Sequence, residues 1–545
     1  MMMASQAIRN IWPRAWNPRL PLSHPDVRTY RIKFLKAAAL NFVLILVLFF
    51  SLFCYLFGSM YQQETRVHSL TVLWVDYDGG GIIGDAVRQA YASLRSSGFP
   101  TLVEKMAADY PSAGALREAV CNTDYWAALY TTQGASAALA DAVSGANSSP
   151  YNASNVLSFI WNEARYPTVM DSLIAGSLQR LSEAARVAYY SLNGTAALAS
   201  IPSASGGGNN AATEAAMTAF TSPWTLTSYN IKPTTQGPRA VYNTILIVLV
   251  LIQDFFYLAI INGLYVQFKI YTRVSPGRIV LVRDAISTVF TMTGSLLLTC
   301  AVWAFRGSWD VSGTQFALTW LVVWLFAHVN FLTLDVFTIW IPPQYISMAL
   351  ISWVVLNVTS IILPFDLSSP FYRWAYALPA HEAYEALTDV WSGGCNPHLH
   401  YALPILFAYE VSGLFWTALG VFRRCHYAAL TEESAQEAMR LRVEAALALE
   451  REHDRRRRVD GEKKALPLLR KEGGDEDGDE DNDDEAGESS QAGRIVGKAT
   501  TDDADRAEAE HEIEEIGEEI ERMETRATRM ANFGPTFRLV GTNEG

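Results

Sequence analysis

Apolar residues gather in six long runs, and polar residues dominate the chain between and after them. The first run, residues 37–57, reads AAALNFVLILVLFFSLFCYLF and has no polar face over its whole length. About 20 apolar residues in a helix cross a hydrocarbon core of roughly 30 Å. The other five runs occupy residues 241–268, 285–305, 316–340, 346–363 and 401–421. The pattern predicts an α-helical polytopic membrane protein with six transmembrane helices.

Lysine and arginine residues flank these runs in three clusters, which predict the orientation of the helices. The first cluster precedes the first run and consists of Arg28, Arg31, Lys33 and Lys36. The second lies between the second and third runs and consists of Lys269, Arg273, Arg278 and Arg283. The third follows the sixth run and consists of Arg423 and Arg424. With six spans all three clusters lie in the cytosol. We therefore expect both termini to be cytosolic.

This topology divides the chain into five parts. They are a cytosolic N-terminal segment (1–36), the first transmembrane helix (37–57), an extracytosolic domain (61–240), a five-helix transmembrane block (241–421) and a cytosolic tail (422–545). Within the extracytosolic part, strand-like runs at 68–78, 101–105 and 125–131 alternate with helix-like segments. Such alternation is typical of a small α/β layer, and residues 168–198 suggest a helical stalk behind it.

The tail changes the meaning of the overall charge. The formal net charge is −13, and residues 422–545 hold about 33 acidic and about 20 basic residues, so the tail carries the whole imbalance. Its almost purely acidic stretch, 473–490, is predicted to be disordered. Segments 431–453 and 505–530 are predicted to be helices, the second with a thin apolar stripe that would pair with the first or with a cytosolic partner.

Four ionisable residues lie inside the apolar runs. Asp254 and Glu410 are each near the middle of a span, and His328 and Asp335 lie seven residues apart, on one face of a helix. Buried charges cost several kcal/mol unless they face a partner or water. One interpretation is a path for a polar substrate or for protons, and the other is hydrogen bonding between helices. The second is favoured for Asp335, nearer the cytosolic end.

The expected lumenal segments carry candidate covalent modifications. Glycosylation sequons occur at Asn147, Asn152 and Asn193. Of the five cysteines, only Cys121 and Cys395 fall outside the cytosol and outside the spans in this topology. Since the secretory route is oxidising, a disulfide between them is one expectation, and two separate buried thiols are the alternative.

Motifs of catalysis or cofactor binding do not emerge from the sequence. His381 and Glu382 begin an HExxE, which lacks the second helical histidine of a zinc protease. Asp76 and Asp78 stand at a strand end beside three glycines, where a capped turn is favoured over a phosphate or metal site. We found no phosphate-binding loop that would supply ATP hydrolysis. We therefore expect no enzyme activity, no cofactor, no metal and no nucleic-acid partner.

Three segments resemble a known family. They are FGSMYQQETRVHSLTVLWVDYDGGGIIGDAV after the first span, DYWAALYTTQGASAALADAV at 124–143, and SSPFYRWAYALPAHEAYEALTDVWSGGCNPHLHYALPILFAYEV at 368–411. They resemble the fungal nitrosoguanidine-resistance membrane proteins. The layout is more distantly similar to phage-infection proteins and to the membrane subunits of ABC-2 type exporters.

The resemblance implies a transporter-like protein of the plasma membrane that confers resistance to toxic small molecules such as nitrosoguanidine. The alternative is a membrane scaffold, or a regulator of lipid asymmetry or of another transporter. The implied partners are the lipid bilayer, an unknown small-molecule substrate, and either further copies of the chain or a separate ATPase subunit.

Overall fold

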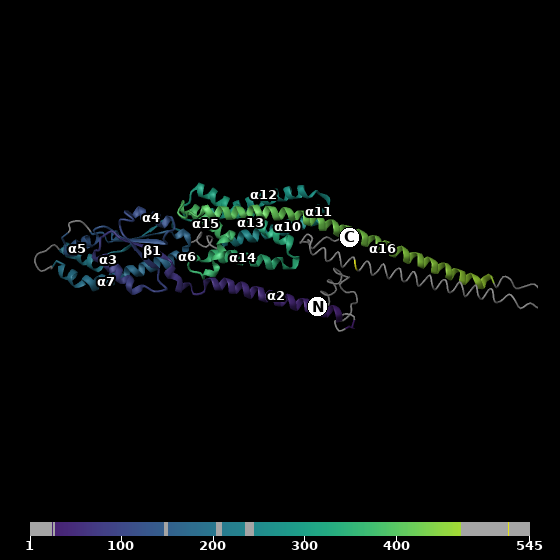
Figure 1. Cartoon of the computed structure of the whole chain (residues 1–545), viewed down its shortest axis with the longest axis horizontal. Helices are drawn as coiled ribbons and strands as arrows, with labels where there is room; N and C mark the ends of the chain where they lie inside the picture. The colour runs from purple at the N-terminus through teal and green to yellow at the C-terminus, as the bar shows by residue number, and fades with distance from the viewer. Residues whose placement is uncertain are drawn as a thin grey trace, which may run out of the picture. The chain divides into compact units, whose positions relative to one another are not determined.

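The structure is a computed structural model that describes residues 24–25, 28–146, 151–202, 210–234, 245–469 and 522. The chain divides into two compact units. Unit 1 comprises Met1–Leu249, Leu298–Val323 and Ser347–Leu406, and unit 2 comprises Val250–Leu297, Trp324–Ile346 and Phe407–Gly545. The helices α10, α12, α13, α14 and α16 contribute residues to both units. Figure 1 labels the main helices and the first strand along the chain.

Six helices in the described part of the chain are long and apolar enough to cross a membrane, which confirms the predicted number. Their apolar stretches are Arg31–Met60, Leu246–Gln267, Pro276–Ala304, Gly313–Trp340, Pro343–Ile362 and Leu399–Arg458. They belong to α2 (Arg28–Met60), α10 (Leu246–Gln267), α12 (Pro276–Ala304), α13 (Gly313–Trp340), α14 (Ile346–Ile362) and α16 (Leu399–Leu469).

In unit 1, residues between α2 and α10 form a five-stranded sheet in the order β2-β1-β3-β4-β5. The strands are β1 (Thr71–Asp76), β2 (Thr101–Lys105), β3 (Ala127–Thr131), β4 (Leu157–Trp161) and β5 (Leu226–Asn230). Strand β1 pairs in parallel with β2 and β3, β4 is antiparallel to β3, and β5 is parallel to β4. The sequence had suggested β1, β2 and β3, and it had not suggested β4 or β5.

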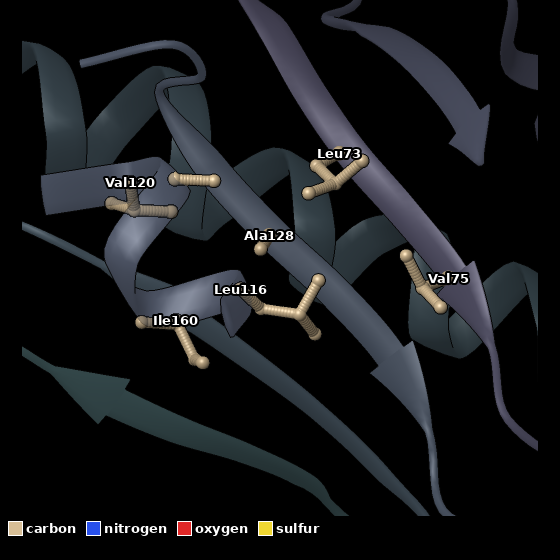
Figure 2. Packing of buried hydrophobic residues seen from close by; sticks show 7 residues of the cluster. Leu73, Val75, Leu116, Val120, Ala128 and Ile160 are labelled. Atoms are coloured by element: carbon tan, nitrogen blue, oxygen red, sulfur yellow. The ribbon is translucent and has the colours of Figure 1, made fainter. Parts of the chain in front are cut away.

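The helices between these strands are α3 (Ile82–Leu94), α4 (Ala113–Cys121) and α5 (Ala135–Ser144), followed by α7 (Gly176–Ser200) and α8 (Asn210–Thr221). Alternate residues of β1 face opposite sides of the sheet. Figure 2 shows one side, where Leu73 and Val75 of β1 and Ala128 of β3 pack against Leu116 and Val120 of α4. Helices alternating with strands therefore place a buried apolar core on this face.

The segment at 168–198 is helical, as predicted, and it packs against other helices of unit 1 where a stalk was expected. The segment consists of α6 (Pro167–Val169), a π-helical turn (Met170–Ala175) and α7. Helix α7 packs along α3 and also contacts α5. Its residues Leu178, Leu181 and Ala185 are fully buried. Their spacing of three and four gives the helix an apolar stripe that needs a partner, and α3 supplies it.

The expected boundary at residue 422 is also not a break in secondary structure. Helix α16 runs without interruption from the sixth span to Leu469, through the segment that was expected to be a separate tail helix. The predicted disorder of 473–490 and the predicted helix at 505–530 lie outside the described residues, apart from Arg522.

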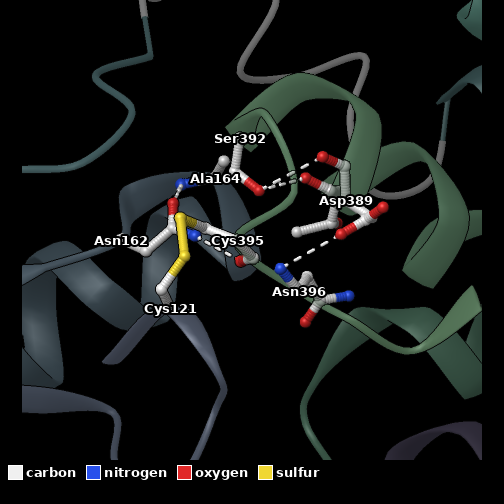
Figure 3. The surroundings of a disulfide bond; sticks show 8 residues. Cys121, Asn162, Ala164, Asp389, Ser392, Cys395 and Asn396 are labelled. Atoms are coloured by element: carbon white, nitrogen blue, oxygen red, sulfur yellow. Dashed lines mark hydrogen bonds between the residues drawn. A yellow bond between two sulfur atoms is a disulfide. The ribbon is translucent and has the colours of Figure 1, made fainter. Parts of the chain in front are cut away.

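Cys121, at the end of α4, and Cys395, in the loop between α15 (Pro379–Ser392) and α16, are joined in a disulfide with Cα atoms 4.1 Å apart. Figure 3 shows that the amide of Asn162 donates to the carbonyl of Cys395 at 3.0 Å beside this bond. Nearby, the backbone N–H of Asn396 donates to Asp389 at 3.2 Å. Residues far apart in the sequence are thus tied together within unit 1.

We predict that this disulfide holds a cleaved chain together. A protease site inserted at Gly307, an exposed position between the two cysteines, should give one band without reductant and two bands with it. Cys395→Ser should give two bands under both conditions. In the chain-entropy model, closing a loop of 274 residues stabilises by about 5 kcal/mol, so Cys395→Ser should also lower the unfolding temperature. Two bands from the unreduced parent would disprove the bond.

The sequons differ in their surroundings. Asn152 is exposed and its side-chain oxygen accepts from the N–H of Ser154, whereas Asn193 is half-buried within α7. Asn147 lies outside the described residues. We predict that Asn152→Gln removes a glycosidase-sensitive shift in gel mobility and that Asn193→Gln leaves it in place. The reverse result would contradict this assignment, and no shift in the parent would argue that the segment is not lumenal.

Candidate functional site

Four membrane helices pack together in unit 2, and their contacts give their directions. Between α10 and α12, the rings of Tyr257 and Phe290 stack with their centroids 3.5 Å apart. One turn earlier on α10, Gln253 lies against Gly294, which is one turn later on α12. These contacts step in opposite directions along the two helices, so the pair is antiparallel. Helices α13 and α16 are parallel, because Leu332 faces Gly413 and Ile339 faces Gly420. Alternating directions along the chain agree with consecutive spans.

Glycine is required at those two positions of α16. A Cβ atom at Gly413 would come within 2.8 Å of the Leu332 side chain, and one at Gly420 would overlap Ile339. Small residues at membrane-helix interfaces allow backbones to approach closely. The close approach sets the distance across which side chains of α13 and α16 meet.

The first polar cluster is centred on Asp335 of α13. The Arg283 guanidinium of α12 donates to both oxygens of this carboxylate, at 2.7 and 2.9 Å. Arg424 of α16 donates to it at 3.0 Å, and Asn262 of α10 accepts from Arg283 at 2.7 Å. The side chains of Arg283, Asp335 and Arg424 are 3%, 1% and 1% exposed. This geometry connects all four helices and supports the structural interpretation of Asp335.

Arg283 and Arg424 were counted above among the basic residues flanking the spans. That reading is wrong for these two, since both are buried ion-pair partners of Asp335. The remaining residues of the two clusters include Lys269, Arg273 and Arg278, all exposed. A signal was available: with the predicted six spans, Arg283, Asp335 and Arg424 all fall toward the expected cytosolic side of the membrane.

The second polar cluster joins His328 of α13 to Glu410 of α16. The Nδ1 atom of His328 lies 2.6 Å from Oε1 of Glu410, and its Nε2 atom lies 3.2 Å from the hydroxyl of Ser287 on α12. The other carboxylate oxygen of Glu410 is buried without a hydrogen-bond partner in the described part of the chain. A carboxylate and an imidazole in this contact can share and exchange a proton.

The third buried acid, Asp254, stands apart. It is 2% exposed, and its Oδ2 atom has no hydrogen-bond partner among the residues that the structure describes. Helices α10 and α13 are parallel, with Tyr257 near Phe331 and Asn262 near Thr338. The same register puts Asp254 near the level of His328. The structure therefore brings together His328 and Glu410, and it does not join Asp254 to them by a hydrogen bond.

A polar stripe on α12 runs past the first two clusters. Buried polar residues recur at every fourth position, as Arg283, Ser287, Thr291, Ser295 and Thr299. At a rise of 1.5 Å per residue the stripe covers roughly 24 Å of the helix. Asp284, half-buried, follows Arg283 on this helix. The sequence analysis missed both Asp284 and the stripe.

The HExxE sequence belongs to a different buried network, in unit 1. The Glu385 carboxylate lies 2.6 Å from Nδ1 of His398 and accepts from the Asn396 amide at 2.6 Å. Burial alone would raise the pKa of Glu385, but the hydrogen bond from His398 and the charge of His381 lower it to about 2. Among the described residues, no group of three or more His, Cys, Asp and Glu side chains has the arrangement of a metal site.

The acids at the end of β1 and in the turn after it also serve local structure. Asp76 accepts from the hydroxyl of Thr131 at 2.5 Å and from Arg88 at 2.9 Å, and its side chain is 5% exposed. Asp78 accepts from the backbone N–H of Ser136 at 3.0 Å. These bonds tie the turn after β1 to β3 and α5, which agrees with the capped-turn interpretation.

The six apolar helices and the buried charges between them define a polytopic membrane protein. The chain belongs to the family described as "Protein of unknown function (DUF3533)", whose model matches residues 41–415. It is similar to the "Uncharacterized endoplasmic reticulum membrane protein YJR015W" of Saccharomyces cerevisiae, with 22% identity over 382 residues, or 66% of this chain and 74% of that protein. No solved structure matches the chain.

Proposed function

We propose that this membrane protein is a proton-coupled exporter that confers resistance to toxic small molecules. The observation that carries the proposal is the contact between His328 and Glu410, in the middle of their spans and beside the polar stripe of α12. Ionisable groups inside a membrane are costly and commonly mark ion, proton or substrate pathways. The resemblance to nitrosoguanidine-resistance proteins supplies the substrate class.

The proposed topology has both termini and α16 beyond the span in the cytosol, with the sheet of unit 1 on the opposite side. The proposed location is the plasma membrane. The yeast relative is named as a protein of the endoplasmic reticulum membrane, so location is a direct test. We expect a fluorescent fusion to outline the cell. A signal confined to the nuclear envelope and internal membranes would reject the plasma-membrane assignment.

Export is tested by loading cells with a labelled alkylating compound and following its loss. Cells that express the chain should lose the compound faster than cells that lack it, and a protonophore should remove the difference. Equal loss with retained resistance would favour the other candidate, a scaffold or regulator acting on another membrane protein.

A further inference from the structure

Asp254 lies on the buried, apolar face of α10. The residue is 2% exposed, and its Oδ2 atom has no hydrogen-bond partner in the described part of the chain. Residues three and four positions away on a helix share its face, and here they are Val250, Leu251 and Leu258, each at most 2% exposed. The helix therefore presents this carboxyl group to the protein interior among aliphatic side chains.

Aromatic rings occupy the next turn of the same face. Tyr257 stacks on Phe290 of α12, and its ring centroid lies 6.3 Å from that of Phe331 of α13. These contacts close α10 against both neighbouring helices one turn after Asp254. A carboxylate that stayed ionised in such surroundings would lose its water without gaining a polar partner, at a large cost in free energy.

The cationic side chains buried on the neighbouring helices already have acidic partners. Arg283 and Arg424 both pair with Asp335, at 2.7 and 3.0 Å. The Nδ1 atom of His328 lies 2.6 Å from Glu410. These three cations are therefore engaged by the other two buried acids and do not supply a counter-charge to Asp254.

Arg283 is also separated from Asp254 along the bundle. Arg283 donates to Asn262, which lies eight residues after Asp254 on α10. Eight residues of helix rise roughly 12 Å. The acidic and basic side chains that α12, α13 and the first part of α16, up to Arg424, bury or half-bury are Arg283, Asp284, His328, Asp335, Glu410, Arg423 and Arg424. Of these, Arg423 donates to the carbonyl of Ile339, and Asp284 has the same charge as an ionised Asp254.

We propose that Asp254 holds a proton of its own in the folded protein and is a second proton-binding site, separate from the contact between His328 and Glu410. The proton removes the charge for which the surroundings offer no partner. The part that concerns transport rests on the proposed function: in a proton-coupled exporter, Asp254 releases this proton when the helices part and water enters. Since Asp254 lies near the level of His328, the same opening reaches both sites.

A hydrophobic carbodiimide tests the bound proton on the full-length protein. A nitrogen of dicyclohexylcarbodiimide takes the proton of the acid, and the central carbon bonds to the carboxyl oxygen. The acyl group then moves from that oxygen to a nitrogen, so the whole reagent is added and nothing leaves. By peptide mass mapping we expect modification of Asp254 at neutral pH, less at alkaline pH, and none at Asp335 between its two arginines. Glu410→Gln should leave the modification of Asp254 unchanged.

Asparagine substitution gives a second readout, which does not depend on access of the reagent. Asp254→Asn exchanges a neutral acid for a neutral amide of similar shape, so the unfolding temperature should stay at the value of the parent protein. The matched control, Asp335→Asn, removes a charge that lies between Arg283 and Arg424 and should lower the unfolding temperature. In proteoliposomes with an imposed membrane potential, Asp254→Asn should reduce proton entry to the protein-free rate.

The results separate the bound proton from its role in transport. Absence of the carbodiimide from Asp254 in the folded parent would overturn the bound proton, as would an unfolding temperature that falls as far with Asp254→Asn as with Asp335→Asn. Proton entry at the parent rate with Asp254→Asn would overturn the role in transport. If the parent itself admits no protons, the proposed function fails, and modification and unfolding still decide whether Asp254 holds a proton.

Discussion

Replacing Asp335 by alanine is expected to destabilise the four-helix packing of unit 2 by about 3–5 kcal/mol, the range found when one partner of a buried ion pair is removed. The change leaves Arg283 and Arg424 buried without their carboxylate, and it also removes an acceptor from Thr338. The measurement is the thermal unfolding of the detergent-solubilised protein. Thr333→Ala is the control, because the hydroxyl of Thr333 donates to the carbonyl of Val329 within its own helix.

A second variant separates charge from packing. Changing Arg283 and Arg424 to methionine and Asp335 to leucine removes all three charges together. Buried ion pairs are often no better for stability than apolar groups of similar volume. We therefore expect this triple variant to be more stable than Asp335→Ala. If the triple variant were the less stable of the two, the three charged residues would stabilise the fold by more than the neutralisation of one another's charge.

Replacing Glu410 by glutamine is expected to abolish resistance without lowering the amount of protein. Glutamine is similar in size to glutamate and keeps an acceptor for His328, but its amide group neither binds nor releases a proton near neutral pH. His328→Gln should have the same effect. The measurement is growth in the presence of the toxic compound, with the protein quantified in the membrane fraction.

Ser412→Ala is the matched control for this experiment. It lies two residues from Glu410 on α16, is exposed, and its hydroxyl bonds to the carbonyl of Tyr409 in the same helix. It should leave resistance unchanged. Normal resistance with Glu410→Gln would exclude the contact between His328 and Glu410 from the transport step. Loss of the variant protein from the membrane would show that this contact stabilises the structure, as the ion pairs of Asp335 do.

The sequence predicts the parts of this fold that local pattern determines. Apolar length alone predicts the six membrane helices, and strand-like runs predict β1, β2 and β3. Strand β5, with the sequence LTSYN, has little apolar character, and its strand state depends on pairing with β4 about 70 residues away. Propensity within such a short window does not contain that information.

The candidate site shows the same limit. The buried acids were visible as charges within apolar runs, but their partners were not. Arg283 was taken as a flanking charge because it lies near the start of its span, and only the packing of α12 on α13 shows that it meets Asp335. His328 and Glu410 are 82 residues apart, and the parallel packing of α13 and α16 brings them into contact.

Proton flux through the purified chain tests the central claim most directly. Proteoliposomes that contain only this protein and an internal pH-sensitive dye are exposed to an imposed membrane potential. The account predicts proton entry well above that of protein-free liposomes, at an unchanged rate for Ser412→Ala and at the protein-free rate for His328→Gln and Glu410→Gln. Proton entry at the same rate in the parent protein and in both of these variants would contradict it, as would no entry above protein-free liposomes.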